Sequence, residues 1–202
     1  MKLYLNKTSP YARLVLATAM EAGLADGIEK IWIEPWDDAP ELLAVNPLGK
    51  IPALLTPAGE PLIESACICD FLIAQARRPD LLPMPQDISA REEVLRRVAL
   101  GRAAMDCAFG AVIQRRFNGG KDTELSQRWL RALPRAATEI ERIAVRRGLP
   151  AAPDLGDLAV AVAFDYIRFR LAEVPCLDGT PALARLLEAM NRRPSLQSTR
   201  PD

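Results

Sequence analysis

Ser9 is the residue of this sequence that is best placed to take part in a reaction. It lies in the run Thr8-Ser9-Pro10-Tyr11, and a serine followed by a proline is a favoured start for an α-helix. The start of a helix has free N–H groups and a partial positive charge, so it favours a bound anion. A hydroxyl group at this point could donate a hydrogen bond to a negatively charged atom, or it could serve only to cap the helix.

The composition removes several other kinds of chemistry. The sequence has no histidine, and its four cysteines (Cys67, Cys69, Cys107 and Cys176) form no Cys-x-x-Cys pair. A Ser-His-Asp or Cys-His catalytic site would lack its general base. A zinc site would lack its usual ligands, and a dithiol oxidoreductase would lack its redox pair. We therefore expect no metal, and buried thiols in a reduced protein. The 26 basic and 26 acidic residues balance, so no nucleic-acid partner is expected.

The elements that would position Ser9 alternate between strand and helix over the first 76 residues. The patterns predict four short strands, at residues 3–5, 28–33, 51–55 and 61–63. They predict helices at 9–23 and from residue 64 onward, with one helical turn at 41–44. This β-α-β-(α)-β-β-α order is that of a thioredoxin-like domain.

The rest of the chain is predicted to be helical. The expected helices cover residues 88–117, 122–148 (with Pro134 as a site for a kink), a stretch from Asp154 onward and 181–191. Asp154 and Asp157 have nearly the spacing of a capping box. The predicted fold class is an α/β thioredoxin-like N-terminal domain at 1–77, a proline-rich linker at 78–87 and an all-α C-terminal helical domain at 88–202.

The arginines are unevenly distributed along this sequence. Arg96, Arg97 and Arg102 lie close together on a predicted helix. Such clusters usually form solvated helix faces, and we favour that interpretation over a phosphate-binding patch. Arg13 on the first helix is expected to face solvent or an acidic partner.

Three motifs of the first domain resemble those of the glutathione S-transferase family. They lie at residues 9–13, 46–54 and 64–72, and residues 154–159 and 193–201 add a helix-capping signature and a tail like those of a bacterial member. The resemblance covers nearly the whole chain and identifies a serine-type (Ser-Pro) active-site motif. It implies glutathione as co-substrate with no tightly bound cofactor, a homodimer, and a role in detoxification.

The resemblance assigns a role to each of the downstream motifs. Ile51 and Pro52 would be joined by a cis peptide bond that turns the backbone of Ile51 toward an extended peptide ligand. Ser65 would hold the γ-glutamyl carboxylate and Glu64 the ammonium group of glutathione, although both are also ordinary helix-capping residues. Lys50 would neutralise the glycine carboxylate, unless it is a surface lysine only.

The resemblance makes Ser9 the residue that activates the ligand. A cysteinyl thiol has a pKa of about 8.5, so a hydrogen bond from Ser9 would help to hold the glutathione sulfur as a thiolate at neutral pH. Thr8, Tyr4 and Tyr11 are alternative donors. Redox-active relatives carry a cysteine where Ser9 stands, so a disulfide mechanism is not expected. By analogy, Asp106 would reach the ligand of the neighbouring subunit.

The resulting hypothesis is a transferase that conjugates glutathione to small hydrophobic electrophiles. Phe109, Ile113 and Phe117 would offer apolar contacts to the electrophile, unless they are core positions. The alternatives are a non-catalytic regulatory protein and a specialised isomerase, dehalogenase or lyase. The N-terminus does not resemble a signal peptide, and no apolar run approaches the roughly 20 residues of a membrane span, so a cytoplasmic protein without a membrane partner is expected.

Overall fold

The computed structural model describes residues 1–77, 80–81 and 83–201. The chain forms two compact units, of which the first comprises Met1–Met84 with Pro194–Asp202 and the second comprises Pro85–Arg193. The domain boundaries proposed from the sequence stay a prediction. Residues 78–79 and 82 of the predicted linker lie outside the described residues.

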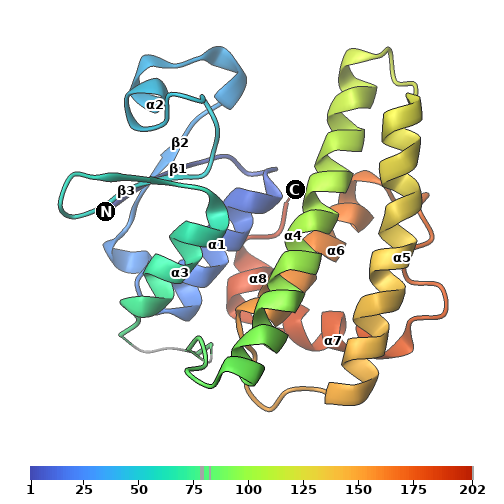
Figure 1. Ribbon diagram of the computed structural model, residues 1–202. Coiled ribbons are helices and arrows are strands. Elements are labelled where there is room, and N and C mark those ends of the chain that lie inside the picture. Colours follow the sequence, from blue (N-terminus) through green and yellow to red (C-terminus); the bar gives the residue numbers. More distant parts are fainter. Residues whose placement is uncertain (78–79, 82, 202) are drawn as a thin grey trace. The chain divides into compact units, whose positions relative to one another are not determined.

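The first unit contains a mixed four-stranded sheet with the strand order β2-β1-β3-β4 (Figure 1). The strands are β1 (Lys2–Leu5), β2 (Glu29–Trp32), β3 (Ala53–Leu55) and β4 (Pro61–Ile63). β1 is parallel to β2 and antiparallel to β3, and β3 and β4 form an antiparallel hairpin. This arrangement confirms the predicted thioredoxin-like domain.

The helices of the first unit cover the two faces of this sheet (Figure 1). Helices α1 (Pro10–Glu21) and α3 (Ser65–Ala74) pack against each other on one face. The short helix α2 (Pro40–Val45) lies on the other face, where Tyr4 and Ala53 of the sheet pack with its Leu42. Strand residues alternate between faces, so the buried Leu3 and Leu54 point to the opposite side from Tyr4 and Ala53. Two 3₁₀ turns complete the connections, η1 (Ala25–Gly27) and η2 (Pro35–Asp37).

One further helix of the first unit was not predicted from the sequence. Helix α8 (Pro194–Ser198) comes from the far end of the chain and contacts α1. Its buried residues are Ser195 and Leu196. The sequence pattern is too short to reveal such an element, because a helix of five residues shows little more than one turn of periodicity.

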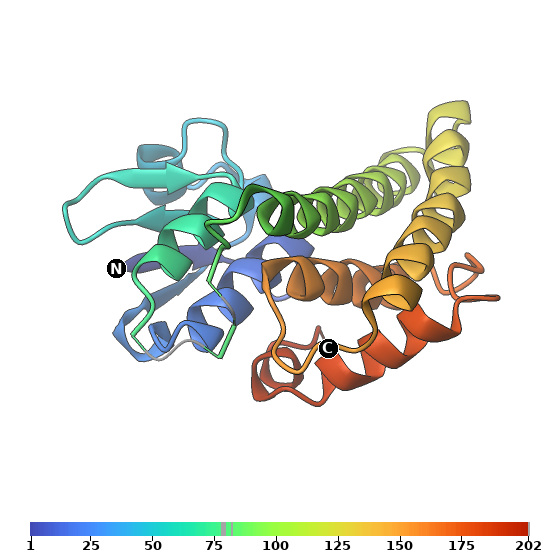
Figure 2. The ribbon, with the colours of Figure 1, turned by 60° about the horizontal axis from the view of Figure 1, so that its bottom comes forward.

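The second unit is a bundle of four helices, which confirms the predicted helical region. They are α4 (Ile88–Phe117), α5 (Glu124–Arg147), α6 (Leu155–Arg170) and α7 (Pro181–Asn191). Helix α6 lies alongside α4 in both Figure 1 and Figure 2, and it also contacts α7. Helix α5 continues through Pro134. Among the described residues, no helix is both long and apolar enough to span a membrane.

At Gly101, helix α4 lies close to the backbone of α6. A Cβ atom placed on Gly101 would lie 2.7 Å from the carbonyl carbon of Ala159 and 2.9 Å from the backbone nitrogen of Val160. Backbone atoms in a packed helix cannot move aside as a flexible side chain can. Only glycine therefore fits at this crossing.

Arg97 is buried, so its predicted place on a solvated face was wrong. Its side chain is 3% exposed. Its guanidinium donates two hydrogen bonds of 2.7 Å to the carboxylate of Asp154 and one of 2.8 Å to Asp157. A Cβ atom on Gly156 would lie 2.8 Å from the Cβ of Arg97, so this glycine leaves room for the arginine. Helical periodicity alone could not show that α6 begins with two acidic residues against this face of α4.

Asp154 and Asp157 also form the capping box at the start of α6, as the sequence predicted. The carboxylate of Asp154 accepts hydrogen bonds from the backbone of Gly156 and Asp157. Burial by itself would raise the pKa of Asp154, but the hydrogen bonds and charge of Arg97, with the charge of Arg147, hold that pKa below its ordinary value. The resulting stabilisation is complete above about pH 3.9, the ordinary pKa of an aspartate, and is lost as the pH falls through the lowered value.

We expect Gly101→Ala to destabilise the protein by about 1–3 kcal/mol, because its methyl group would overpack the crossing of α4 and α6. On an exposed helix, the same change would stabilise by up to about 1 kcal/mol. The measurement is the free energy of unfolding in denaturant, with Gly27→Ala as the control, since a Cβ on Gly27 meets nothing within 4 Å. A stabilised Gly101→Ala protein would contradict the close approach.

We expect Arg97→Leu to lower the free energy of unfolding by about 3–5 kcal/mol, because it removes the more deeply buried of the two arginines, Arg97 and Arg147, that donate hydrogen bonds to the buried carboxylates of Asp154 and Asp157. The neighbouring Arg96 is the matched control. It pairs with Glu139 on the surface, with side chains 49% and 30% exposed, so Arg96→Ala should cost less than about 1 kcal/mol. Similar losses in the two variants would show that the buried cluster does not stabilise the bundle.

Candidate functional site

The strand pairing of the first unit brings the three predicted motifs to one end of the sheet. Tyr4 of β1 pairs with Ala53 of β3, so the segment that leaves β1 toward Ser9 and residues 51–52, which precede β3, lie at the same end. β4 runs antiparallel to β3, so residues 64–65, which follow β4, also lie there. Segments separated by more than fifty residues in the sequence therefore meet at one sheet end.

Ser9 is the N-cap of α1, as its sequence predicted. Its Oγ accepts a hydrogen bond of 3.2 Å from the backbone N–H of Ala12, and its carbonyl accepts one of 3.0 Å from that of Arg13. A serine hydroxyl has two lone pairs and one proton, and the cap bond uses a lone pair. Capping therefore does not compete with donation of the Ser9 proton to a ligand.

Asn6 shapes the loop that carries Ser9, and sequence analysis missed it. Its Oδ1 accepts hydrogen bonds of 3.2 Å from the backbone N–H of Thr8 and 2.9 Å from that of Ser9. An asparagine two or three residues before a helix cap is a signal for this kind of turn. The side chain of Asn6 thus orients the helix start from outside the helix.

The three alternative donors occupy different positions from Ser9. Tyr4 is 7% exposed and packs in the apolar cluster with α2, so its ring is part of the core. Thr8 is exposed in the loop before the helix, and Tyr11 is half-buried in the first turn of α1. Of these residues, Ser9 is the one whose hydroxyl lies at the helix N-cap.

Residues 46–52 form the second part of the site. The peptide bond between Ile51 and Pro52 is cis, as predicted, and Ile51 precedes β3 and is half-buried. Asn46 is buried and holds the preceding loop: its Nδ2 donates a 2.7 Å hydrogen bond to the carbonyl of Lys50, and its Oδ1 accepts one of 3.1 Å from the N–H of Leu48. The side chain of Lys50 is exposed at the end of this loop.

Glu64 and Ser65 form the third part, at the start of α3. Glu64 has φ 66° and ψ 114°, in a region that residues other than glycine seldom adopt, at a typical cost of about 1–3 kcal/mol. It occupies the N-cap position, but its side chain accepts no capping hydrogen bond. Ser65 is 2% exposed and is the first residue of the helix. The turn therefore places the exposed Glu64 beside a buried serine. Capping by the side chain of Glu64 does not explain the unusual backbone conformation of this residue.

Arg13 was predicted to face solvent or an acidic partner, and its burial contradicts the first of these alternatives. It is 6% exposed, and its Nη2 donates a hydrogen bond of 3.0 Å to the backbone carbonyl of Leu196 in α8. The reason is that α8 covers this side of α1, which the periodicity of α1 does not reveal. The residues predicted on α4 are in the second unit: Asp106 is exposed, Phe109 and Ile113 are half-buried and Phe117 is exposed. Their roles stay predictions.

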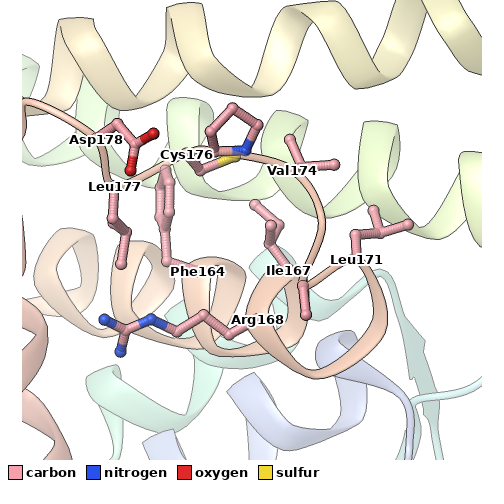
Figure 3. Close-up of a pocket in the computed structure, with 10 residues that line it drawn as sticks. Phe164, Ile167, Arg168, Leu171, Val174, Cys176, Leu177 and Asp178 are labelled. Carbon is pink, nitrogen blue, oxygen red and sulfur yellow. The ribbon is translucent and has the colours of Figure 1, made fainter.

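A cavity of about 230 Å³ lies elsewhere, within the second unit. Phe164 and Ile167 of α6 point toward the loop that carries Cys176 (Figure 3). Burial raises the pKa of Cys176 to about 11, so this thiol stays protonated and unreactive at neutral pH. No predicted site residue in the described part of the chain lines this cavity.

The chain is similar to proteins of one family along its whole length. A family model described as "Glutathione S-transferase, N-terminal domain" matches residues 8–75. The uncharacterized GST-like protein YibF of Escherichia coli (strain K12) is 30% identical over 206 residues, which cover 100% of this chain and 98% of that protein.

Two solved structures show the same similarity in three dimensions. A glutathione S-transferase from Methylobacillus flagellatus KT, with glutathione bound, is 30% identical with a TM-score of 0.87 over 100% of this chain and 99% of its own. A glutathione transferase family member from Pseudomonas fluorescens Pf-5, with bound S-(propanoic acid)-glutathione, is 29% identical with a TM-score of 0.85 over 100% of both chains.

We expect Asn6→Ala to lower the free energy of unfolding by about 1 kcal/mol and to speed hydrogen exchange at the amides of Thr8 and Ser9, because both lose their acceptor. Asn6→Asp is the matched control, since a carboxylate oxygen accepts the same hydrogen bonds. Urea unfolding and amide exchange measure the two effects. Equal changes in both variants would mean that the acceptor at this position does not hold the loop.

Proposed function

Because the chain belongs to the glutathione S-transferase family, we propose that it is a glutathione transferase, which binds glutathione at this end of the sheet and activates its thiol for attack on small hydrophobic electrophiles. The observation that carries the proposal is the meeting of three motifs at one sheet end: the Ser9 helix cap, the cis bond between Ile51 and Pro52, and the Ser65 helix start. Each motif offers a different kind of contact, and glutathione has a group that suits each.

The charges at the site complement those of glutathione. The ligand has two carboxylates, one ammonium group and an extended peptide backbone. Ser65 and the N–H groups of the first turn of α3 would hold the γ-glutamyl carboxylate, and the exposed Glu64 would pair with the ammonium group. The exposed Lys50 would neutralise the glycine carboxylate, and the backbone of Ile51 would pair with that of the cysteinyl residue.

Ser9 would act on the sulfur of the bound tripeptide. The sulfur loses its proton to solvent, and the hydroxyl of Ser9 and the positive end of α1 stabilise the thiolate that remains. The thiolate then uses an electron pair to form a bond to an electrophilic carbon, whose leaving group departs with its own electron pair. The protein orients and stabilises the nucleophile, and no residue of the chain is covalently changed.

A serine at this position sets the kind of chemistry. A cysteine could form a mixed disulfide with glutathione, whereas a serine hydroxyl can only donate or accept a hydrogen bond. The proposal is therefore conjugation and not thiol–disulfide exchange. It extends to a cytoplasmic homodimer with a role in detoxification, in which Asp106 approaches the partner's ligand and apolar residues of α4, such as Phe109, contact the electrophile.

Similar proteins support glutathione as the ligand. The structure from Methylobacillus flagellatus KT contains glutathione, that from Pseudomonas fluorescens Pf-5 contains S-(propanoic acid)-glutathione, and one from Methylobacterium radiotolerans JCM 2831, 29% identical, contains glutathione sulfonate. Two of these ligands carry an addition or an oxidised group at the sulfur, so in those proteins the site accepts a modified sulfur.

We expect Ser9→Ala to raise the pKa of the bound glutathione thiol by about 1–2 units, since a hydrogen bond to a charged group contributes about 1.5–3 kcal/mol. The thiolate is followed by its ultraviolet absorbance as a function of pH, and glutathione binding by calorimetry. Conjugation at pH 6.5 should fall about tenfold or more, because each pKa unit removes about nine-tenths of the thiolate. Binding itself should change little.

Thr8→Val is the matched control, since it removes the neighbouring hydroxyl and leaves the helix cap in place. It should leave the thiol pKa unchanged. If Thr8→Val raises that pKa and Ser9→Ala does not, the donor is Thr8. If the wild-type protein does not bind glutathione, the proposed function is wrong and a non-catalytic role is favoured. A panel of electrophiles then defines the substrate.

A further inference from the structure

Helix α8 and the residue that follows it contact α1 near both ends of α1. Near the start of α1, the Nη2 of Arg13 donates to the carbonyl of Leu196 at 3.0 Å, and its Nε donates to the Oγ1 of Thr199 at 3.4 Å. At the last residue of α1, the carboxylate of Glu21 accepts a hydrogen bond from the hydroxyl of Ser195. All of these residues belong to the first unit.

The two charged residues of α1 in this contact are buried. Arg13 is 6% and Glu21 is 3% exposed, and Leu196, whose carbonyl accepts from Arg13, is fully buried. A buried charge destabilises a fold unless hydrogen bonds satisfy it. A cation in the first turn of a helix is also unfavourable, because it opposes the helix dipole. Arg13 is therefore a costly choice at this position for helix formation alone, and its hydrogen bonds to Leu196 and Thr199 offset part of that cost.

Arg13 is also the residue that holds the backbone of Ser9. Its N–H donates a hydrogen bond of 3.0 Å to the carbonyl of Ser9, the first such bond of α1. The preceding amide, that of Ala12, donates to the Oγ of Ser9. One residue thus bonds to Ser9 through its backbone and to α8 through its side chain.

We propose that Arg13 is a positioning residue for Ser9. Arg13, Leu196 and Thr199 form a clamp that fixes the position of the first turn of α1 relative to the glutathione sulfur. This proposal rests on the proposed function for its chemical consequence. The clamp fixes the direction of the Ser9 hydroxyl and restrains the motion of the N–H groups beside it. Residues far along the chain thereby contribute to the activation of the thiol without contacting the ligand.

The test compares variants at the two ends of α1 in the full-length chain. Arg13→Met removes every donor of the clamp, and we expect it to raise the pKa of the bound glutathione thiol by about one unit, a tenfold loss of thiolate at lower pH. Ser195→Ala removes the contact with Glu21 at the far end, so it should lower stability without moving the thiol pKa. Glutathione affinity should stay near the wild-type value in both, because Lys50, Ile51 and Ser65 are unchanged.

Leu196→Ala separates the clamp from a direct effect of charge. It loosens α8 but keeps the guanidinium of Arg13, so the clamp predicts a raised thiol pKa here too. A pKa that rises in Arg13→Met and not in Leu196→Ala would show that the charge acts by itself, and the clamp would be wrong. Arg13→Lys, which keeps the charge and one donor, should restore part of the wild-type titration. If Arg13→Met does not fold, the Leu196→Ala and Arg13→Lys variants decide the question.

Hydrogen exchange distinguishes failure of the clamp from failure of the proposed function. Exchange at the amides of Ala12 and Arg13 needs no ligand, and the clamp predicts faster exchange there in Arg13→Met and Leu196→Ala than in Ser195→Ala. If the wild-type protein does not bind glutathione but the exchange pattern holds, only the function is wrong. If first-turn exchange stays at the wild-type rate in both clamp variants, the clamp is wrong whatever the ligand.

Discussion

The antiparallel pairing of β1 with β3 is the constraint on which the proposed site depends. It places the end of β1 and the start of β3 side by side, and the β3–β4 hairpin adds the start of α3 to the same edge. Two helices, α1 and α3, therefore begin at one end of the sheet, and the positive ends of both dipoles lie at the proposed site. A shift of one residue in that pairing would turn Tyr4 away from α2 and displace the cis proline from Ser9.

Around this frame, short polar side chains set the local geometry. Asn6 orients the loop before α1, and Asn46 holds the loop before the cis proline, each by hydrogen bonds to backbone groups. Neither needs to touch a ligand to matter. Such a site depends on residues that shape backbone as much as on those that offer functional groups, and Glu64, with its positive φ, belongs to the same class.

Buried arginines serve a parallel purpose in the two units. Arg97 joins α4 to the capped start of α6, and Arg13 joins α1 to α8. In both cases a cation from one helix satisfies polar groups at an element distant in sequence. The guanidinium suits this use because it donates several hydrogen bonds in fixed directions while keeping its charge. The fold thus uses arginine at two junctions between elements that are distant in the sequence.

The sequence by itself determined the order of elements, the bounds of the long helices, the cap at Ser9, the capping box at Asp154 and, through family resemblance, the cis bond before Pro52. These features depend on local chemistry or on motifs with a fixed spacing. Only the tertiary structure decided that Arg13 and Arg97 are buried, that α8 returns to α1 and that Gly101 faces the backbone of α6. Each of these features depends on which surface a distant segment covers. The residues next to a side chain in the sequence do not indicate which distant segment packs against it.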